Sequence, residues 1–231
     1  MSSGIEAFGS ADDAAAAVTI ALLTQLTPPG PKHLLVTGGR GPGPVYDRLA
    51  QVDLDWSRVT VTLSDDRFVP LGSPDSNEQM VRDRLLQGHA AAAKLAPLNG
   101  EAATPDAAAR AIEPTIRALL PFDAALLGMG PDGHIASLYA TTVGAAEQLA
   151  ADGDRLAVGV RSPGWSPYVP RVSLTGRALF DSRLIVLLVG GDDKRAVIEQ
   201  ILADPGFAPP AAALLRQTRS PVRILWSPDA A

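Results

Sequence analysis

Short apolar runs alternate with helical patterns along most of the chain, and this alternation constrains the fold more than any other feature. The runs that predict strands are His33–Thr37, Val59–Leu63, Phe122–Gly128, Leu156–Val160, Leu184–Gly190 and Val222–Trp226. The segments that predict helices are Asp12–Leu26, Pro44–Gln51, Ser76–Leu86, Pro105–Leu119 and Asp192–Ala203, with Thr104 and Ser76 as N-caps. Several strands lack period-2 alternation, which is typical of strands buried on both faces. The sequence therefore predicts an α/β fold, a doubly wound, mostly parallel sheet with helices on both faces.

The length of 231 residues and a hydrophobic content of 46% are enough for one domain over residues 1–231 with a packed core. The N-terminal segment has neither the basic start nor the apolar run of a signal peptide. The longest strongly apolar run, Leu184–Val189, is too short to cross a bilayer. We therefore expect a cytoplasmic protein with no membrane partner.

Charge and composition exclude several classes of function. The net charge is −5 and no basic stripe is visible, so we expect no nucleic-acid partner. The chain has no cysteine, which excludes disulfides, thiolate catalysis and zinc–thiolate sites. His33, His89 and His134 lie far apart in sequence and lack metal-ligand spacing, so no metal is expected. A monomer and a small homo-oligomer both remain open.

Ligands of doubly wound sheets bind where the strands end, so the loops after the strands matter most. The first strand is followed by Thr37-Gly38-Gly39-Arg40-Gly41-Pro42 and then a helix. Glycines let backbone N–H groups approach an anion, and the helix N-terminus adds partial positive charge. This pattern is typical of a phosphate cradle, although it matches neither nucleotide-binding motif. A simple Gly/Pro-rich turn is the alternative.

Two further segments carry charged side chains at strand ends. Asp65-Asp66-Arg67 follows the second strand and suits a polar ligand, with a solvated loop as the alternative. Arg171 and Lys194 come later in the chain, and Lys194 lies near the start of a helix. A cation there is unfavourable with the helix dipole unless it faces an anion. Arg171 can bind a phosphate bidentately and Lys194 adds a point charge, so both are candidates for phosphate binding, with a surface charge as the alternative for each.

The most informative segment is Leu127–Ser137, which reads LGMGPDGHIAS. Its glycines and proline predict a tight loop at the end of the third strand. Asp132 and His134 stand at the end of that loop, near an expected helix start. A histidine two residues from an aspartate in this position indicates a general base.

Taken together and in order, these segments resemble the 6-phosphogluconolactonase family, which shares its fold with glucosamine-6-phosphate deaminase. Two departures stand out. The family usually has Ser-Gly-Gly-Ser-Thr-Pro where this chain has Thr37-Gly38-Gly39-Arg40-Gly41-Pro42. It usually has Asp-Glu-Arg where this chain has Asp65-Asp66-Arg67, so Asp66 is one methylene shorter than the usual glutamate. Ile135 also replaces the usual threonine after the histidine.

The resemblance implies hydrolysis of 6-phosphogluconolactone in the oxidative pentose phosphate pathway, without metal or organic cofactor. His134 would activate the water, and Asp132 would orient or polarise the site. The resemblance further implies that the phosphate is held by the Gly38-Gly39 backbone, Arg171 and Lys194. Asp65 and Arg67 are further candidates for substrate binding, and Arg40 either adds a charge or points to solvent.

Two other functions remain possible. A glucosamine-6-phosphate deaminase would carry a glutamate five residues after the histidine, where this chain has Tyr139, and a tyrosine in place of Arg67. A non-catalytic sugar-phosphate sensor usually has a DNA-binding segment, for which the chain leaves no room if its first strand begins near His33. Both differences favour the lactonase.

Overall fold

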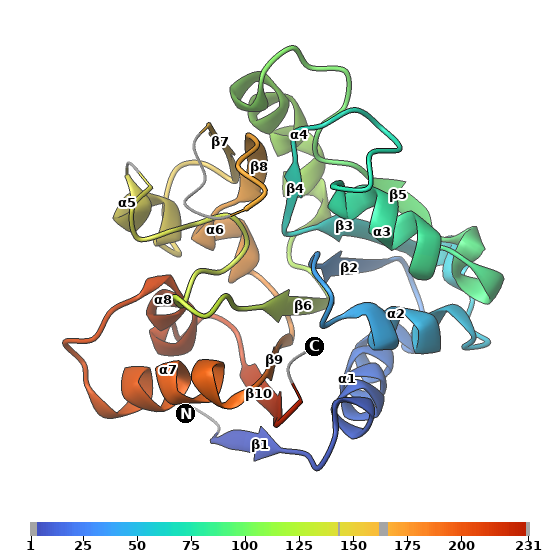
Figure 1. Ribbon diagram of the computed structural model, residues 1–231. Helices are drawn as coiled ribbons and strands as arrows, with labels where there is room; N and C mark the ends of the chain where they lie inside the picture. The colour runs from blue at the N-terminus through green and yellow to red at the C-terminus, as the bar shows by residue number, and fades with distance from the viewer. Residues whose placement is uncertain (1–3, 143, 162–165, 230–231) are drawn as a thin grey trace.

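The computed structural model describes residues 4–142, 144–161 and 166–229, which form two sheets and the helices packed against them (Figure 1). The larger sheet is parallel throughout. Its strands, in spatial order, are β1 (Ile5–Ala7), β10 (Val222–Ser227), β9 (Ile185–Gly190), β6 (Ala124–Gly128), β2 (Lys32–Val36), β3 (Val59–Leu63) and β5 (Lys94–Ala96).

The path of the chain through this sheet is doubly wound. From β2 the chain moves outward to β3 and β5, then returns to β6 on the other side of β2 and continues to β9 and β10. The strand order therefore reverses between β2 and β6, which is where such folds bind ligands. The predicted fold class is confirmed.

Eight α-helices are described, and Figure 1 shows α1, α2 and α3 on one side of the large sheet and α7 and α8 on the other. They are α1 (Ala11–Leu26), α2 (Gly43–Ala50), α3 (Asn77–Arg84), α4 (Pro105–Leu119), α5 (Ala145–Leu149), α6 (Gly176–Leu179), α7 (Asp192–Ala203) and α8 (Pro210–Arg216). Short 3-10 helices cover Trp56–Arg58 and Gly88–Ala92. Both predicted caps are confirmed: Ser76 accepts from the Gln79 N–H, and Thr104 from the Ala107 N–H, each at 3.2 Å.

The smaller sheet has three strands in the order β4 (Asp65–Arg67), β8 (Arg171–Leu174) and β7 (Ala157–Val160). Both of its pairings are antiparallel, and Arg67 lies directly opposite Arg171. The segment Leu156–Val160 was predicted as a strand of the parallel sheet, and that placement is wrong. Its strand instead forms the edge of the small sheet, against which α4 packs.

Two other predictions are corrected. The first strand is β1, not the strand near His33, and β1 extends the large sheet by pairing with β10. No helix begins near His134: residues 131–141 form turns and isolated bridges, in which Ile135 pairs with Met129 and Leu138. Ala136 in this segment has a φ of 49°, which stops a helix from continuing.

The core lies on both faces of the large sheet. Leu34, Leu126 and Leu187, from three neighbouring strands, are each 0% exposed, as expected for strands covered on both faces. Among the described residues, no helix is both long and apolar enough to cross a membrane.

Candidate active site

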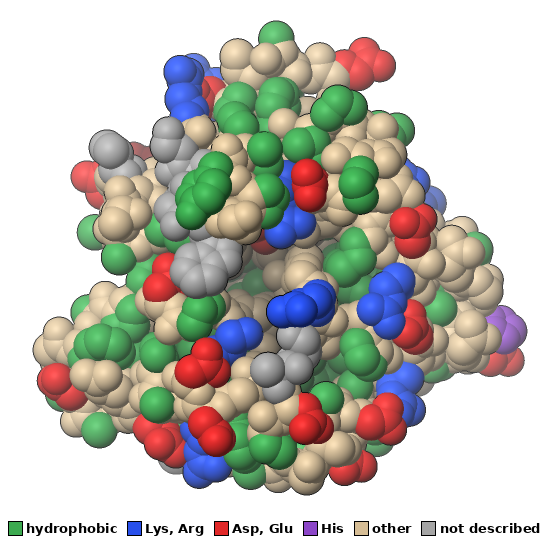
Figure 2. Space-filling model, in the orientation of Figure 1, with side chains coloured by type: hydrophobic (Ala, Val, Ile, Leu, Met, Phe, Trp, Pro, Cys, Tyr) green, Lys and Arg blue, Asp and Glu red, His purple; other side chains and the backbone are tan. Residues whose placement is uncertain are grey.

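A cavity of about 470 Å³ opens where β2, β6, β9 and β10 end and where the small sheet faces them. Figure 2 shows this hollow with Lys and Arg side chains on both sides, over β4 on one side and over the region between α2 and α7 on the other. Eight residues predicted from the sequence line the cavity, namely Gly38, Gly39, Arg40, Asp65, Arg67, His134, Arg171 and Lys194. Segments that are far apart in the sequence therefore meet at one site.

The glycine loop begins at Thr37, whose backbone is held by one buried side chain. The Tyr46 hydroxyl from α2 donates to the Thr37 carbonyl at 2.5 Å and accepts from the Thr37 N–H at 3.1 Å. The Asn77 amide lies against Gly38 so closely that a Cβ atom there would be 1.9 Å from Asn77 Oδ1. Glycine is required at position 38 because any side chain would displace Asn77.

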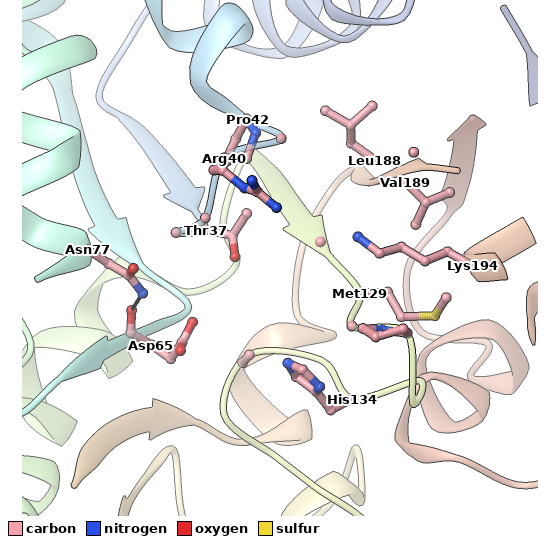
Figure 3. A pocket seen from close by; sticks show the side chains of 18 of the residues that line it. Thr37, Arg40, Pro42, Asp65, Asn77, Met129, His134, Leu188, Val189 and Lys194 are labelled. Atoms are coloured by element: carbon pink, nitrogen blue, oxygen red, sulfur yellow. Dashed lines mark hydrogen bonds between the residues drawn. The ribbon is translucent and has the colours of Figure 1, made fainter. Parts of the chain in front are cut away.

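Two cations face the cavity near this loop. Figure 3 shows the side chains of Arg40 and Lys194 directed into the cavity from different walls. Within the described residues, neither of them forms an ion pair. Lys194 lies in the first turn of α7, where the helix dipole repels a cation. This arrangement suits an anionic group between the two side chains.

The loop after β6 holds His134 at the wall opposite the glycine loop (Figure 3). His134 Nδ1 lies 2.5 Å from Asp132 Oδ1, and the same oxygen accepts from the His134 N–H at 3.2 Å. The histidine side chain is 14% exposed and the aspartate 43%, and Asp132 is not among the cavity-lining residues. Asp132 therefore supports the imidazole from the outside, and the imidazole faces the cavity.

The position of the imidazole is set by its surroundings. A Cβ atom at Gly130 would lie 2.1 Å from the His134 ring, so glycine is required there. The Tyr139 ring packs against the imidazole with 4.6 Å between the ring centroids. The loop is fixed further by α8, because the Ala211 N–H donates to the Gly133 carbonyl at 2.8 Å.

A buried polar network joins the two sheets behind the cavity. Asp65 accepts from the Ser64 hydroxyl at 2.9 Å and from the Ser137 hydroxyl at 2.6 Å. Arg171 Nη1 lies 3.4 Å from the Ser137 hydroxyl, and its guanidinium stands over the Tyr139 ring. Burial lowers the pKa of Arg171, whereas the neighbouring Asp65 and Tyr139 favour its charged form. The network thus holds a carboxylate and a guanidinium in contact with the cavity.

Sequence reasoning did not assign a site role to three residues of this region. Asn77 lines the cavity, Ser137 links Asp65 to Arg171, and Tyr139 supports His134. Asn77 directly follows the helix cap Ser76, which was the available signal for it. Ser137 and Tyr139 follow the His134 motif, but only the fold brings them next to the small sheet. Among the described residues, no three His, Asp or Glu side chains gather as metal ligands.

The comparisons with known proteins agree with this geometry. The model of the glucosamine-6-phosphate isomerases/6-phosphogluconolactonase family matches residues 7–226. A 6-phosphogluconolactonase of Caulobacter vibrioides is 45% identical over 96% of this chain and 97% of its own length. The crystal structure of a 6-phosphogluconolactonase from Shewanella baltica has a TM-score of 0.88 at 31% identity, covering 96% of this chain and 97% of that one.

A monomeric glucosamine-6-phosphate deaminase has a TM-score of 0.81 at 18% identity, covering 96% of this chain and 97% of that one, which shows a shared fold alone. The match of the family model spans nearly all of both sheets and includes all but one of the cavity-lining residues. The chain therefore belongs to the glucosamine-6-phosphate isomerase/6-phosphogluconolactonase family.

Proposed function

We propose that this protein is an enzyme that hydrolyses 6-phospho-D-glucono-1,5-lactone to 6-phospho-D-gluconate, with residues 1–231 forming one catalytic domain. The observation that carries the proposal is the His134–Asp132 pair, which faces a cavity that also holds the cations Arg40 and Lys194. A base and an anion site in one cavity fit a substrate with both an activated ester and a phosphate. The relatives named 6-phosphogluconolactonase support the same assignment.

In the proposed mechanism, His134 takes a proton from water as the water oxygen attacks the lactone carbonyl carbon. The hydrogen bond between Nδ1 and Asp132 sets the tautomer in which Nε2 is the basic nitrogen. When the bond between the carbonyl carbon and the ring oxygen breaks, the imidazolium returns the proton to that oxygen. Asp132 stabilises the imidazolium and orients the ring, as a carboxylate does in other His-based sites.

The phosphate positions the lactone for this attack. We assign it to the Gly38-Gly39 backbone, Arg40 and Lys194, with Arg171 completing the cationic wall. The oxyanion of the tetrahedral intermediate needs hydrogen-bond donors, and the backbone N–H groups of Gly130 and Gly133 beside His134 are already used. The Gly130 N–H already donates to the His134 carbonyl at 2.9 Å, and the Gly133 N–H to the Gly130 carbonyl at 3.0 Å.

Deamination of glucosamine 6-phosphate fits this site less well. The position five residues after His134 holds Tyr139, whose ring lies against the imidazole at a tilt of 41° where a deaminase would carry its glutamate. Arg67 occupies the position of the deaminase tyrosine and lines the cavity. Neither replacement provides a second carboxylate beside His134.

The test is to add purified protein to freshly prepared 6-phosphogluconolactone at mildly acidic pH, where hydroxide-driven opening is slow. We expect rapid loss of the lactone with wild-type protein and loss only at the background rate with His134→Ala. Glucosamine 6-phosphate serves as the control substrate, and no ammonia should form. Ammonia release, or the absence of any acceleration of lactone opening, would overturn the proposal.

A further inference from the structure

Asp66 is a buried carboxylate in the wall of the site, and the mechanism above does not use it. It is the middle residue of β4 and is 0% exposed. Because side chains alternate along a strand, Asp65 and Arg67 face the cavity while Asp66 points to the other side of β4. Asp66 therefore acts on the site from behind.

The Asp66 carboxylate joins three separate segments. It accepts from the backbone N–H groups of Arg67 at 2.8 Å and Asn77 at 2.6 Å. It also accepts from the Ser76 hydroxyl at 3.1 Å and from Asn99 Nδ2 at 3.2 Å. These donors belong to β4, to the N-terminus of α3 and to the loop after β5, so one side chain fixes their relative positions.

Two of the residues fixed in this way line the cavity. Asn77 packs its amide on Gly38 of the glycine loop and donates from Nδ2 to the Asp65 carbonyl at 3.0 Å. Arg67 carries its guanidinium to the cavity and donates from Nη1 to the Asp75 carbonyl at 2.8 Å. A shift of either residue would change the wall that links β4 to the glycine loop.

The ionised form of Asp66 is unfavourable for folding. Among the described residues no cation pairs with it, and the charged groups nearby are Asp65 and Arg67 of the same strand. Ser76, Asn77 and Asn99, which face it from the other segments, carry no charge. Burial raises the pKa of the Asp66 carboxyl from 3.8 to about 6, with Asp65 adding to the rise and the hydrogen bonds opposing it.

From these contacts we propose that Asp66 is a positioning residue, whose carboxylate holds Arg67 and Asn77 in the orientation that binds the substrate. This inference rests on the proposed function for the identity of the substrate. A neutral side chain of the same shape lacks the second acceptor oxygen, so donors that Asp66 satisfies lose their partner.

The test compares Asp66→Asn with Asp66→Glu, which keeps the charge and has the length usual in the family. For Asp66→Asn we expect the KM for 6-phosphogluconolactone to rise about tenfold with kcat within about threefold of wild type. We expect little change in Tm near neutral pH, because the loss of one acceptor oxygen is offset by the removal of a buried charge. Asp66→Glu should keep the KM within about threefold of wild type.

Asp123→Asn is the matched control. Asp123 is also a buried, hydrogen-bonded aspartate, accepting from Lys32 Nζ at 3.0 Å and the His33 N–H at 2.9 Å, but it precedes β6 at the opposite end of the sheet. Its replacement should lower the Tm and leave the KM unchanged. If Asp66→Asn fails to fold, Asn99→Ala removes one donor to Asp66 and should raise the KM to a smaller extent.

Two further measurements separate this inference from the proposed function. Affinity for 6-phosphogluconate, measured by calorimetry, should fall in Asp66→Asn even if wild-type protein does not hydrolyse the lactone. Hydrogen exchange at the Arg67 and Asn77 amides needs no ligand and should become faster in that variant. A KM equal to that of wild type in Asp66→Asn would overturn the inference. If Asp66→Asn does not fold, the same result in Asn99→Ala would overturn it. Unchanged hydrogen exchange at both the Arg67 and Asn77 amides would also overturn it.

Discussion

The two sheets build the cavity in different ways. The large sheet contributes the loops that follow its strands, which carry the glycine loop, His134 and Lys194. The small sheet contributes the strands themselves, because Asp65 and Arg67 lie within β4 and Arg171 begins β8. The central strands of the large sheet are mostly apolar and form the core, whereas β4 and β8 of the small sheet are partly polar and form a wall of the site. A strand that lines a cavity thus has a different composition from one that lines a core.

This comparison predicts that the loops of the large sheet provide the base and the main phosphate contacts, whereas the strands of the small sheet provide binding groups only. The largest expected effect is that of His134→Ala, which removes the base: kcat should fall by a factor of about 10² to 10⁴. Thermal unfolding should change little, because the imidazole fills no core position. His89→Ala, which alters an exposed histidine, should leave kcat at the wild-type value.

Arg171→Met tests the small sheet. Removal of the guanidinium takes a charged group from the cavity wall and leaves Asp65 without the nearby positive charge, so the KM should rise about 10- to 100-fold. The kcat should change less than in His134→Ala. Steady-state kinetics of both variants should be measured side by side. If Arg171→Met lowered kcat and left the KM unchanged, the small sheet would not have the binding role that the comparison gives it.

Lys194→Ala removes a phosphate-binding group that the segment after β9 of the large sheet provides, for comparison with Arg171 on a strand of the small sheet. The KM should rise about tenfold with little change in kcat, because one of several phosphate contacts is lost. Stability should stay the same or rise by a few tenths of a kcal/mol, since a cation leaves the first turn of α7. Lys94→Ala, at an exposed position of β5, is the control and should have no effect on the KM.

The last prediction concerns the pH dependence of stability at Asp66. A folded-state pKa raised from 3.8 to about 6 adds stability below pH 4, and this contribution disappears as the pH rises through about 6. The change amounts to roughly 3 kcal/mol at most. The Tm of Asp66→Asn relative to wild type should therefore be higher at pH 7.5 than at pH 4.5. An equal difference at both values would mean that Asp66 titrates normally.

The same contrast explains which parts could be predicted from the sequence. The runs that became β2, β3, β6, β9 and β10 are apolar, because strands covered on both faces must be. β4 reads Asp-Asp-Arg and β8 reads Arg-Val-Ser-Leu, so neither shows a hydrophobic pattern that predicts a strand. The site residues on these strands were found from their charged side chains and their places in the chain, and from the resemblance of their motifs, rather than from periodicity.

Local motifs also differ in what they reveal. The Asp132–His134 contact is local, and its spacing in the sequence predicted the pair that the structure places 2.5 Å apart. The contacts of Ser137 with Asp65 and of Ala211 with Gly133 join residues that are 72 and 78 positions apart. Such contacts depend on the packing of one element on another, and a single sequence does not contain that information.

The pairing of β1 with β10 has a consequence for synthesis on the ribosome. β1 is made long before its neighbour in the sheet, because Ile5 of β1 pairs with Ile224 of β10. At about 5 to 20 residues per second, β1 waits roughly 10 to 40 s for its partner. The Asp229 carboxylate, which accepts from the Ala11 N–H at 3.2 Å, is made later still. The edge of the large sheet is thus completed only after β10 has been made, although the strands around the glycine loop can pair long before.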